Sequence, residues 1–472
     1  MLRASFLGFY DFDGDGILDV LVGSLGQRTE ITRYPIRIFK GNLKKGKLSY
    51  VLKTKLPEDK IYPSVSISVI DYNLDGHLDL YLANWYDKTN KERITPEGDR
   101  LFKGTGFEFK DISYVLKNEH NYDKENEVFP NFTPSFSVAS CDVDLNGYPD
   151  LLVTSTSGYR NKLWLNLNDP EHDDRLFKDY GEESGFAGDT EGSYGLKSGG
   201  NTFFASCHDY NNDGLIDIYV GEVFHSYDSS KRDRSSVLTG ENIYFPPRLN
   251  RTEYHLDDGS GHWSQGDRRG NWIDVDADGL TDLIVENSGF PPKSRMILFK
   301  QEKDHFFDSL GKDYGLDMLN PSGGVVIDYN RDGKQDYFVG QTKLRNSSLP
   351  GHLFAFVNEI NNNNRSLKIY LRGKKSNWQG LGSRVILKTD KASRQSWHHP
   401  QAGAQPSQNE EGVYFGLSQE NVKSLKVIWP YLGESGILKK NYDLSRLNLT
   451  RHSILTLCES GKILKGKHKN CL

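Results

Sequence analysis

Short runs of β-branched and aromatic residues alternate with polar loops along the first 350 residues, and the pattern repeats every 54 to 71 residues. In each repeat an apolar run such as SVSISVI at 64–70 enters a polar loop, and a second run such as HLDLYLA at 77–83 leaves it. A third run such as NKLWLN at 161–166 follows, and an F-x-D pattern ends the repeat, as at 177–179. Runs of this length and composition are typical of β-strands. We therefore expect about four strands in each repeat.

A four-stranded repeat of this length has the size of one β-propeller blade. One such sheet cannot bury both of its faces, whereas a ring of sheets can, and closing the ring leaves only short edges. The sequence therefore predicts an all-β fold with a β-propeller over residues 1–350.

Each repeat carries one copy of the polar pattern D-x-[DN]-x-[DN]-G-x-x-D. Short oxygen-bearing side chains at alternating positions of a tight loop can converge on Ca²⁺, which takes about six to eight oxygen ligands. Glycine at the sixth position permits the sharp turn, and the carbonyl of the seventh residue is the natural backbone ligand. The predicted ligands are Asp11, Asp13, Asp15, Ile17 and Asp19; Asp71, Asn73, Asp75, His77 and Asp79; Asp142, Asp144, Asn146, Tyr148 and Asp150; Asp209, Asn211, Asp213, Leu215 and Asp217; Asp274, Asp276, Asp278, Leu280 and Asp282; and Asp328, Asn330, Asp332, Lys334 and Asp336.

Other interpretations of these loops fit less well. A single Asp-Gly-rich stretch is an ordinary turn signal, but six copies with oxygen at the same four positions favour a metal. An EF-hand needs a glutamate at the twelfth position and flanking helices, whereas the twelfth positions here are aliphatic, as at Val22 and Leu82. Dockerin-type loops lie much closer together than these. The sequence therefore predicts up to six calcium sites.

The repeated loops and their flanking strands resemble the FG-GAP or VCBS (integrin-α-like) propeller repeats over roughly residues 1–350. The resemblance implies that each calcium loop joins the first two strands of a blade, and that partners dock on the opposite side of the disc. Seven blades are usual for this type. We therefore favour seven, the seventh lacking a loop or being built from C-terminal strands.

The calcium pattern stops near residue 350, and strand-like runs continue. The strings SNWQGLGSRVIL at 376–387, GVYFGLS at 412–418 and VKSLKVIWP at 422–430 resemble the ASPIC/UnbV domain, with Tyr414 standing where that family usually has histidine. We expect a small β domain over 351–460 and a basic tail over 461–472. The combination resembles the cartilage acidic protein family and its bacterial relatives. It implies exported calcium binding, with adhesion or matrix roles in animals and a biosynthetic role in some bacteria.

The negative charge of the loops indicates a structural role for the metal. The formal net charge of the chain is −5, and the six loops hold 20 of its 64 acidic residues. Converging carboxylates repel one another when no cation is present, so calcium is expected to stabilise the fold. No apolar run is long enough to span a membrane, and the start of the chain shows no signal peptide. We expect an extracellular or periplasmic location because such loops suit millimolar calcium. Peripheral membrane association stays open, and no nucleic-acid partner is expected.

The remaining chemistry is sparse. Cys141 and Cys207 are expected to be buried free thiols, whereas a disulfide between Cys458 and Cys471 is one of the alternatives for that pair. No common catalytic motif occurs, and Trp397-His398-His399 is interpreted as an exposed loop. The long insert between Gly221 and Trp263 is the favoured place for a lid or ligand site, because long loops on a rigid scaffold often carry function. The possible ligand-binding residues there are His225, Tyr227, Tyr244, His255 and His262.

Three functions are compatible with these features. The favoured hypothesis is a non-catalytic propeller that binds a protein or glycan partner, with calcium in a structural role. The second is an enzyme or accessory protein of natural-product biosynthesis that uses the propeller face and the 221–263 insert. The third is a structural subunit of an exported or membrane-associated assembly.

Overall fold

The computed structural model of the 472-residue chain describes residues 6–23, 35–56, 62–87, 95–116, 133–167, 177–188, 199–224, 234–242, 244–254, 265–289, 294–302, 305–309, 311–399, 401–402, 407–469 and 471. Within these ranges the regular structure is strand, apart from helix α1 (Gly181–Ser184) and a 3-10 turn (Ser113–Val115). Over the same ranges, no helix is long enough and apolar enough to span a membrane. The predicted all-β class is confirmed.

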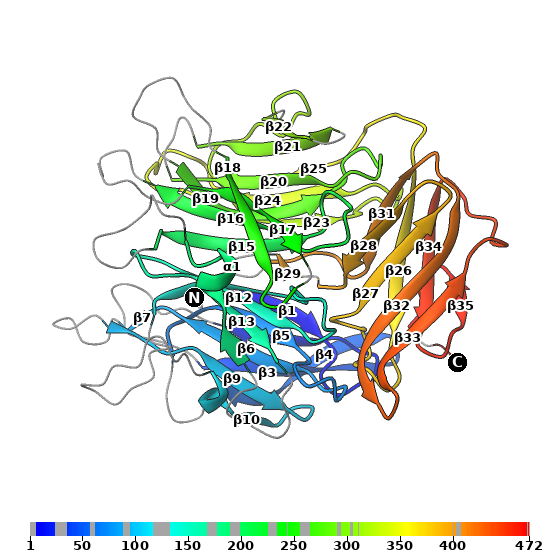
Figure 1. The fold of residues 1–472 in the computed structure, drawn as a ribbon, viewed down its shortest axis with the longest axis horizontal. Helices are drawn as coiled ribbons and strands as arrows, with labels where there is room; N and C mark the ends of the chain where they lie inside the picture. The colour runs from blue at the N-terminus through cyan, green and yellow to red at the C-terminus, as the bar shows by residue number, and fades with distance from the viewer. Residues whose placement is uncertain are drawn as a thin grey trace.

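Six small antiparallel units of three or four strands follow one another along the chain, and we call them blades 1 to 6 (Figure 1). Blades 4 and 5 are joined into one eight-stranded sheet by a short pairing of their second and first strands. Blades 1 to 3 contain β1 (Phe6–Tyr10), β2 (Asp19–Gly23), β3 (Ile36–Lys44) and β4 (Lys47–Leu56); β5 (Ser64–Ile70), β6 (Asp79–Asn84), β9 (Arg100–Gly104) and β10 (Phe109–Asp111); and β11 (Ser135–Cys141), β12 (Asp150–Ser155), β13 (Lys162–Asn166) and β14 (Phe177–Asp179). Blades 4 to 6 contain β15 (Thr202–His208), β16 (Asp217–Phe224), β17 (Ser236–Asn242) and β18 (Arg248–Glu253); β19 (Gln265–Ile273), β20 (Asp282–Asn287), β21 (Met296–Glu302) and β22 (His305–Ser309); and β23 (Pro321–Ile327), β24 (Asp336–Gln341) and β25 (Leu353–Phe356). A two-stranded hairpin, β7 (Tyr86–Asp87) with β8 (Thr95–Pro96), projects from blade 2.

The hydrophobic core of this region lies between neighbouring blades. Residues of blade 2 such as Leu101 share one cluster with Val153 and Trp164 of blade 3. Similar clusters join the other successive blades. The strands β5, β6, β12 and β20 are consequently buried at every position. A sheet covered on both faces carries continuous apolar runs instead of a strict alternation, which explains the apolar runs in the sequence.

The inner strands of the blades lie against one another in the order β1, β5, β11, β15, β19 and β23. The hairpin of β29 (Gln401–Ala402) and β30 (Ser407–Gln408) comes from the C-terminal region, and β30 lies against both β23 and β1. Gln408 exchanges two hydrogen bonds with the backbone of Phe9, at 2.6 and 2.9 Å. Glu410 N donates to Val326 O at 2.9 Å on the other side. The expected seventh blade is therefore corrected: the described residues form six blades, and a C-terminal hairpin lies between the sixth and the first.

The C-terminal region is a sandwich of two four-stranded sheets, seen at the right of Figure 1. One sheet has the order β31 (Val413–Ser418), β26 (Arg365–Arg372), β34 (His452–Cys458) and β35 (Ile463–Lys465), and the other β28 (Ser393–Trp397), β27 (Arg384–Thr389), β32 (Val422–Gly433) and β33 (Gly436–Asp443). Trp429 and Leu371 belong to the shared core. Because β25 pairs with β24, the sixth blade extends past the expected boundary at 350. Because β35 pairs with β34, the expected basic tail begins inside the sandwich.

Two disulfides cross-link the described residues. Cys458 bonds Cys471, which was one open possibility, and Cys141 bonds Cys207, where free thiols were expected. The expectation was wrong because β11 and β15 are adjacent inner strands of blades 3 and 4. A separation of 66 residues in sequence gives no sign of that contact.

Replacing Cys141 and Cys207 together by serine should lower the free energy of unfolding by about 2–5 kcal/mol, because the cross-link restricts the unfolded chain. Denaturant unfolding followed by fluorescence measures the loss. The control variant replaces Cys458 and Cys471 by serine. Their disulfide closes a loop of only 13 residues, so its loss should lower the free energy of unfolding by less. A larger loss from the control pair would contradict this ranking.

Candidate functional site

Six loops of one geometry join the first and second strands of the six blades. Loops 1 to 6 are residues 11–19, 71–79, 142–150, 209–217, 274–282 and 328–336. In every loop the first aspartate accepts a hydrogen bond from the N–H of the sixth-position glycine, at 2.8–3.1 Å. The side-chain oxygen at the fifth position accepts from the N–H of the seventh residue, at 2.7–3.0 Å. These bonds turn the short oxygen side chains toward the inside of the loop.

The last aspartate of each loop connects three strands. One carboxylate oxygen accepts from the N–H of the second loop residue, at 2.7–3.1 Å. The other accepts from a backbone N–H on the third strand, or two residues after it in blade 6, at 2.8–2.9 Å, the donors being Gly41, Gly104, Asn166, Gly240, Gln301 and Asn358. These carboxylates are at most 1% exposed. The sequence pattern predicts this residue only as a metal ligand and does not indicate its contact with the third strand.

The backbone of the loops confirms one expectation and adds a second. The sixth-position glycines have φ between 77° and 95°, as the sharp turn requires. The fourth position is also left-handed in all six loops, although five of its residues are not glycine: Leu74, Leu145, Asn212, Ala277 and Arg331. A left-handed conformation is unfavourable for such side chains, so the surrounding hydrogen bonds must maintain it. No residue type at this position marked it in the sequence.

The loops bring carboxylates close together. In loops 1, 3 and 5, three carboxylates place ligand atoms within 4.8 Å of one another, namely Asp11, Asp13 and Asp15; Asp142, Asp144 and Asp150; and Asp274, Asp276 and Asp282. Burial, with repulsion from Asp144, raises the pKa of Asp142 to about 7. Burial, with repulsion from Asp213 and Asp209, raises the pKa of Asp217 to about 8. A nearby cation favours the ionised form of a carboxyl group, so a cation in these loops would stabilise the folded protein.

The donor atoms test whether a metal fits. Asp142 Oδ1, Asp209 Oδ1 and Asp328 Oδ1 are buried and accept no hydrogen bond. An oxygen of this kind costs free energy unless something supplies positive charge or a proton. Loops 3, 4 and 6 therefore fit an additional cation. In the other three loops an ammonium group already lies beside the carboxylates.

The loops face the C-terminal sandwich. Gln379 Oε1 accepts from Asp11 N of loop 1 at 2.9 Å, and Leu432 N donates to Leu74 O of loop 2 at 3.1 Å. Arg384 on β27 attracts both Asp142 of loop 3 and Asp209 of loop 4.

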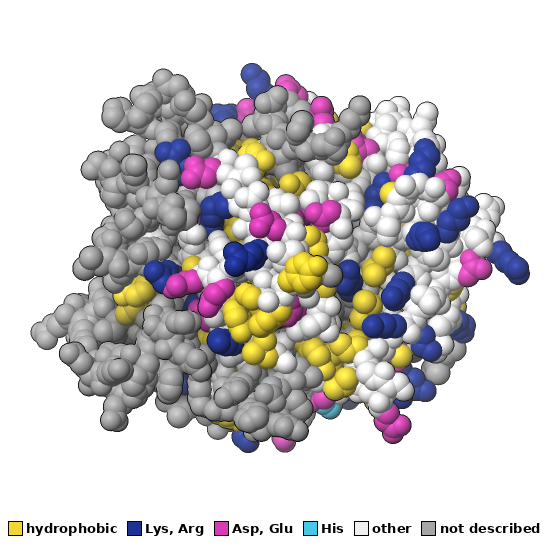
Figure 2. Space-filling model, viewed as in Figure 1, with side chains coloured by type: hydrophobic (Ala, Val, Ile, Leu, Met, Phe, Trp, Pro, Cys, Tyr) yellow, Lys and Arg dark blue, Asp and Glu magenta, His cyan; other side chains and the backbone are white. Residues whose placement is uncertain are grey.

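The contacts continue around the disc. Arg394 Nε donates to Gly279 O of loop 5 at 3.0 Å, and Ser366 Oγ donates to Gly333 O of loop 6 at 2.8 Å. Residues 351–472 carry 19 lysines and arginines against eight acidic residues, a formal charge of +11, whereas residues 1–350 carry −16. Figure 2 shows basic side chains over the sandwich. The loop face is therefore a domain interface between parts of opposite charge.

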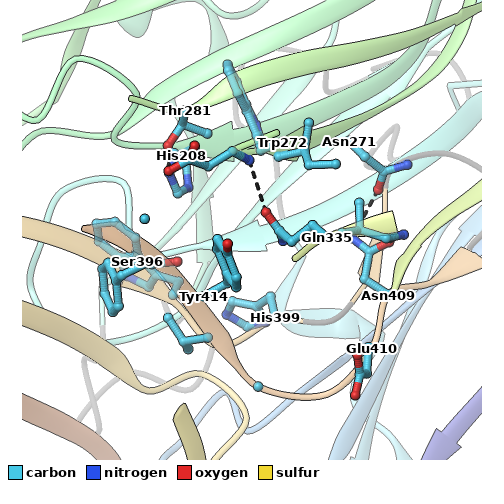
Figure 3. Close-up of a pocket in the computed structure, with 18 of the residues that line it drawn as sticks. His208, Asn271, Trp272, Thr281, Gln335, Ser396, His399, Asn409, Glu410 and Tyr414 are labelled. Atoms are coloured by element: carbon cyan, nitrogen blue, oxygen red, sulfur yellow. Dashed lines mark hydrogen bonds between the residues drawn. The ribbon is translucent and has the colours of Figure 1, made fainter. Parts of the chain in front are cut away.

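A cavity of about 190 Å³ lies between the blades and the sandwich (Figure 3). Asn409 Nδ2 donates to Asn271 Oδ1, and Gln335 Oε1 accepts from Asp274 N, both at 3.0 Å. His208 stacks on Trp272 with ring centroids 5.7 Å apart. Burial lowers the pKa of His208 to about 4, so this histidine is neutral near pH 7.

The 397–399 segment is more buried than the sequence predicts. His398 is only 1% exposed, and it contacts Gly380 O and accepts from Gly412 N, each at 3.2 Å. His399 lines the cavity, and burial followed by repulsion from His398 lowers its pKa to about 4. The prediction of an exposed loop was wrong because this segment of the sandwich packs against the blades.

The predicted ligand site in the 221–263 insert lies mostly outside the described residues and stays a prediction. His225, Tyr227, His255 and His262 lie outside them. Tyr244 is 78% exposed at the turn between β17 and β18. These two strands account for much of the insert, since they are the outer strands of blade 4.

Gly416→Ala should loosen the domain interface. The added carbon would lie 1.8 Å from Asp274 Oδ2 of loop 5, so the sandwich must shift away. We expect faster proteolysis between the two parts and a loss of about 1–3 kcal/mol in unfolding free energy. Gly433→Ala is the control, because its nearest neighbour, Tyr431 Cε1, lies at 3.5 Å. Equal behaviour of the two variants would contradict the interface described here.

The fold and these loops can be compared with known proteins. No curated protein matches the chain. Among solved structures, the exotype rhamnogalacturonan lyase YesX is 13% identical, with 97% of this chain and 74% of that chain covered and a TM-score of 0.37. The rhamnogalacturonan lyase YesW is 15% identical, with 85% and 66% covered and a TM-score of 0.37. A fructofuranosidase from Schwanniomyces occidentalis is 9% identical, with 94% and 89% covered and a TM-score of 0.31. Similarity at this level transfers no activity.

Two family models match the sequence itself. The FG-GAP-like repeat matches residues 11–82, which include loops 1 and 2. The family described as ASPIC and UnbV matches residues 373–449, within the sandwich. The chain therefore combines FG-GAP-like repeats with a C-terminal ASPIC and UnbV domain.

Proposed function

We propose that the chain is an exported calcium-binding β-propeller protein that serves as a protein- or glycan-binding module, with calcium in a structural role. The observation that carries the proposal is the common geometry of the six loops. Each loop gathers four oxygen side chains, and one of them is the buried carboxylate that links the second strand to the third.

The oxygen donors suit calcium. Ca²⁺ binds carboxylate, amide and backbone carbonyl oxygens in flexible geometry. In loop 4, for example, Asp209, Asn211, Asp213 and Asp217 would hold the ion, with the carbonyl of Leu215 as the backbone ligand. The ion would neutralise the converging carboxylates and stiffen the junction of three strands.

The interface suggests where a partner binds. The sandwich covers the loop face, so a partner would contact other parts of the disc, such as the face opposite the loops. The cavity of about 190 Å³ is smaller than the roughly 300–1,000 Å³ of most ligand pockets. We therefore base the proposal on a binding surface and not on a catalytic pocket.

The disulfides support export. Cys141–Cys207 and Cys458–Cys471 would persist in an oxidising compartment, where structural disulfides are common. Millimolar calcium outside the cell would also fill sites of moderate affinity, of the order found in extracellular modules.

Removing calcium should lower the melting temperature, and adding it back should restore the original value. A site held at about 100 times its Kd contributes roughly 2.7 kcal/mol of stability. Differential scanning calorimetry with a chelator, then with excess calcium or excess magnesium, measures the effect. Identical melting curves in chelator and calcium would reject the metal in this proposal.

A matched pair of variants locates the effect. Asp209→Asn removes one carboxylate from loop 4 and should reduce the calcium-dependent gain in melting temperature. Asp443→Asn removes the same charge from an exposed residue at the end of β33 away from the turn that reaches loop 2, and should leave the gain unchanged.

The binding role is tested with the full chain on panels of immobilised polysaccharides and extracellular-matrix proteins. We expect saturable binding to at least one of them in calcium, and weaker binding in chelator because the blades loosen. If calcium stabilises the chain but the chain binds none of these molecules, the proposed role of calcium stands and the proposed binding role is rejected.

A further inference from the structure

The six loops divide into two groups according to one residue on the third strand or, in blade 6, directly after it. This residue precedes the backbone N–H that bonds the last aspartate of the loop. It is a lysine in blades 1, 2 and 5, and an uncharged residue in blades 3, 4 and 6. The residues are Lys40, Lys103 and Lys300 in the first group, and Leu165, Thr239 and Val357 in the second.

Each of the three lysines reaches into its own loop. Lys300 Nζ lies 3.1–3.3 Å from oxygens of Asp276, Asp278 and Asp282, and the lysine side chain is only 5% exposed. Lys40 Nζ contacts both Asp13 and Asp15, the latter at 2.7 Å.

The ion pair in blade 2 is looser, and among the described residues no lysine forms an ion pair with loop 6, although Lys368 attracts Asp328 from a longer distance. Lys103 Nζ lies 3.3 Å from Asp75 Oδ2 and is 36% exposed. Loop 6 itself contains Lys334, but this lysine donates to Asn358 O and not to a loop carboxylate.

The first aspartate of each loop shows the same division. In loops 1, 2 and 5 its Oδ1 accepts from the N–H of the fifth residue, at 3.0–3.2 Å. In loops 3, 4 and 6 that N–H bonds the side chain of the third residue instead. The first aspartate of these loops, Asp142, Asp209 or Asp328, then keeps a buried Oδ1 without a hydrogen-bond donor. Among the first aspartates, those of the loops without a lysine are therefore the ones with an unsatisfied Oδ1. In loop 5 a different oxygen, Asp276 Oδ1, also accepts no hydrogen bond, but Lys300 Nζ lies 3.2 Å from it.

We propose that a lysine ammonium takes the place of calcium in loops 1, 2 and 5, so that calcium binds selectively in loops 3, 4 and 6. The inference rests on the proposed function, because it assumes that the loops bind calcium, and it reduces the expected six ions to three.

The physical reason is competition for the same oxygens. An ammonium group and Ca²⁺ are both attracted to the converging carboxylates, and both cannot lie among them at once. Calcium could enter loop 5 only by displacing the buried Lys300 from three carboxylates. Lys103 contacts one carboxylate and is the most exposed of the three lysines, so loop 2 is the lysine loop that calcium should fill most readily at high concentration.

Equilibrium dialysis against buffered calcium, with metal content measured by mass spectrometry, counts the ions bound per chain. We expect three in the wild type. Lys300→Met should bind four, whereas Lys300→Arg keeps the charge and should bind three. In the reverse direction, Val357→Lys places a lysine at the equivalent position of blade 6 and should bind two. Its control, Val357→Met, should bind three. Val357 is 42% exposed, so these two variants should fold even if Lys300→Met does not.

The outcomes separate the two proposals. No bound calcium in the wild type would overturn the proposed function and this inference together. Six ions in the wild type would overturn the inference and leave the proposed function standing. An unchanged count in Val357→Lys, with circular dichroism like that of the wild type, would also overturn the inference.

Discussion

A buried carboxylate at the ninth loop position holds each blade together. It bonds the start of its own loop and the backbone of the third strand, so three strands meet at one side chain. Such a carboxylate is tolerated inside a protein only when donors or cations surround it. The neighbouring loop aspartates add further negative charge at the same place. The architecture of the blades therefore depends on positive charge that the loops do not supply themselves.

The structure supplies this charge from two places within the chain. Lysines on the third strand, such as Lys300, reach the loop of their own blade. Arginines of the sandwich, such as Arg384, approach loops from the other side of the interface. The unsatisfied oxygens of loops 3, 4 and 6 mark where these groups do not suffice. Calcium from solution is the third source that we propose.

The C-terminal sandwich is part of the propeller's construction as well as its neighbour. It covers the loop face, and its hairpin of β29 and β30 lies between blades 6 and 1. The bonds of Gln408 to Phe9 and of Glu410 to Val326 join the ends of the blade series. Loss of the sandwich would expose acidic loops and leave β1 and β23 without this contact. The two parts are therefore expected to fold as one unit.

The nine-residue pattern and its spacing were sufficient to predict an all-β propeller-like fold and the positions of the loops. They were sufficient because the oxygens of one loop lie within nine residues, and because one blade is one repeat. The number of blades, the burial of His398 and the Cys141–Cys207 bond could not be predicted in this way. Each depends on residues that are far apart in sequence and adjacent only after the blades pack.

The sequence alone determined which residues can hold a cation, since that is set by local side-chain chemistry. Tertiary structure decided which cation each loop meets. Lys300 lies 18 residues after Asp282 in sequence, and only the pairing of β20 with β21 brings the ammonium to the carboxylate. Likewise, only the docking of the sandwich made the loop face of the disc an interface, because complementary charge and shape are properties of the folded domains.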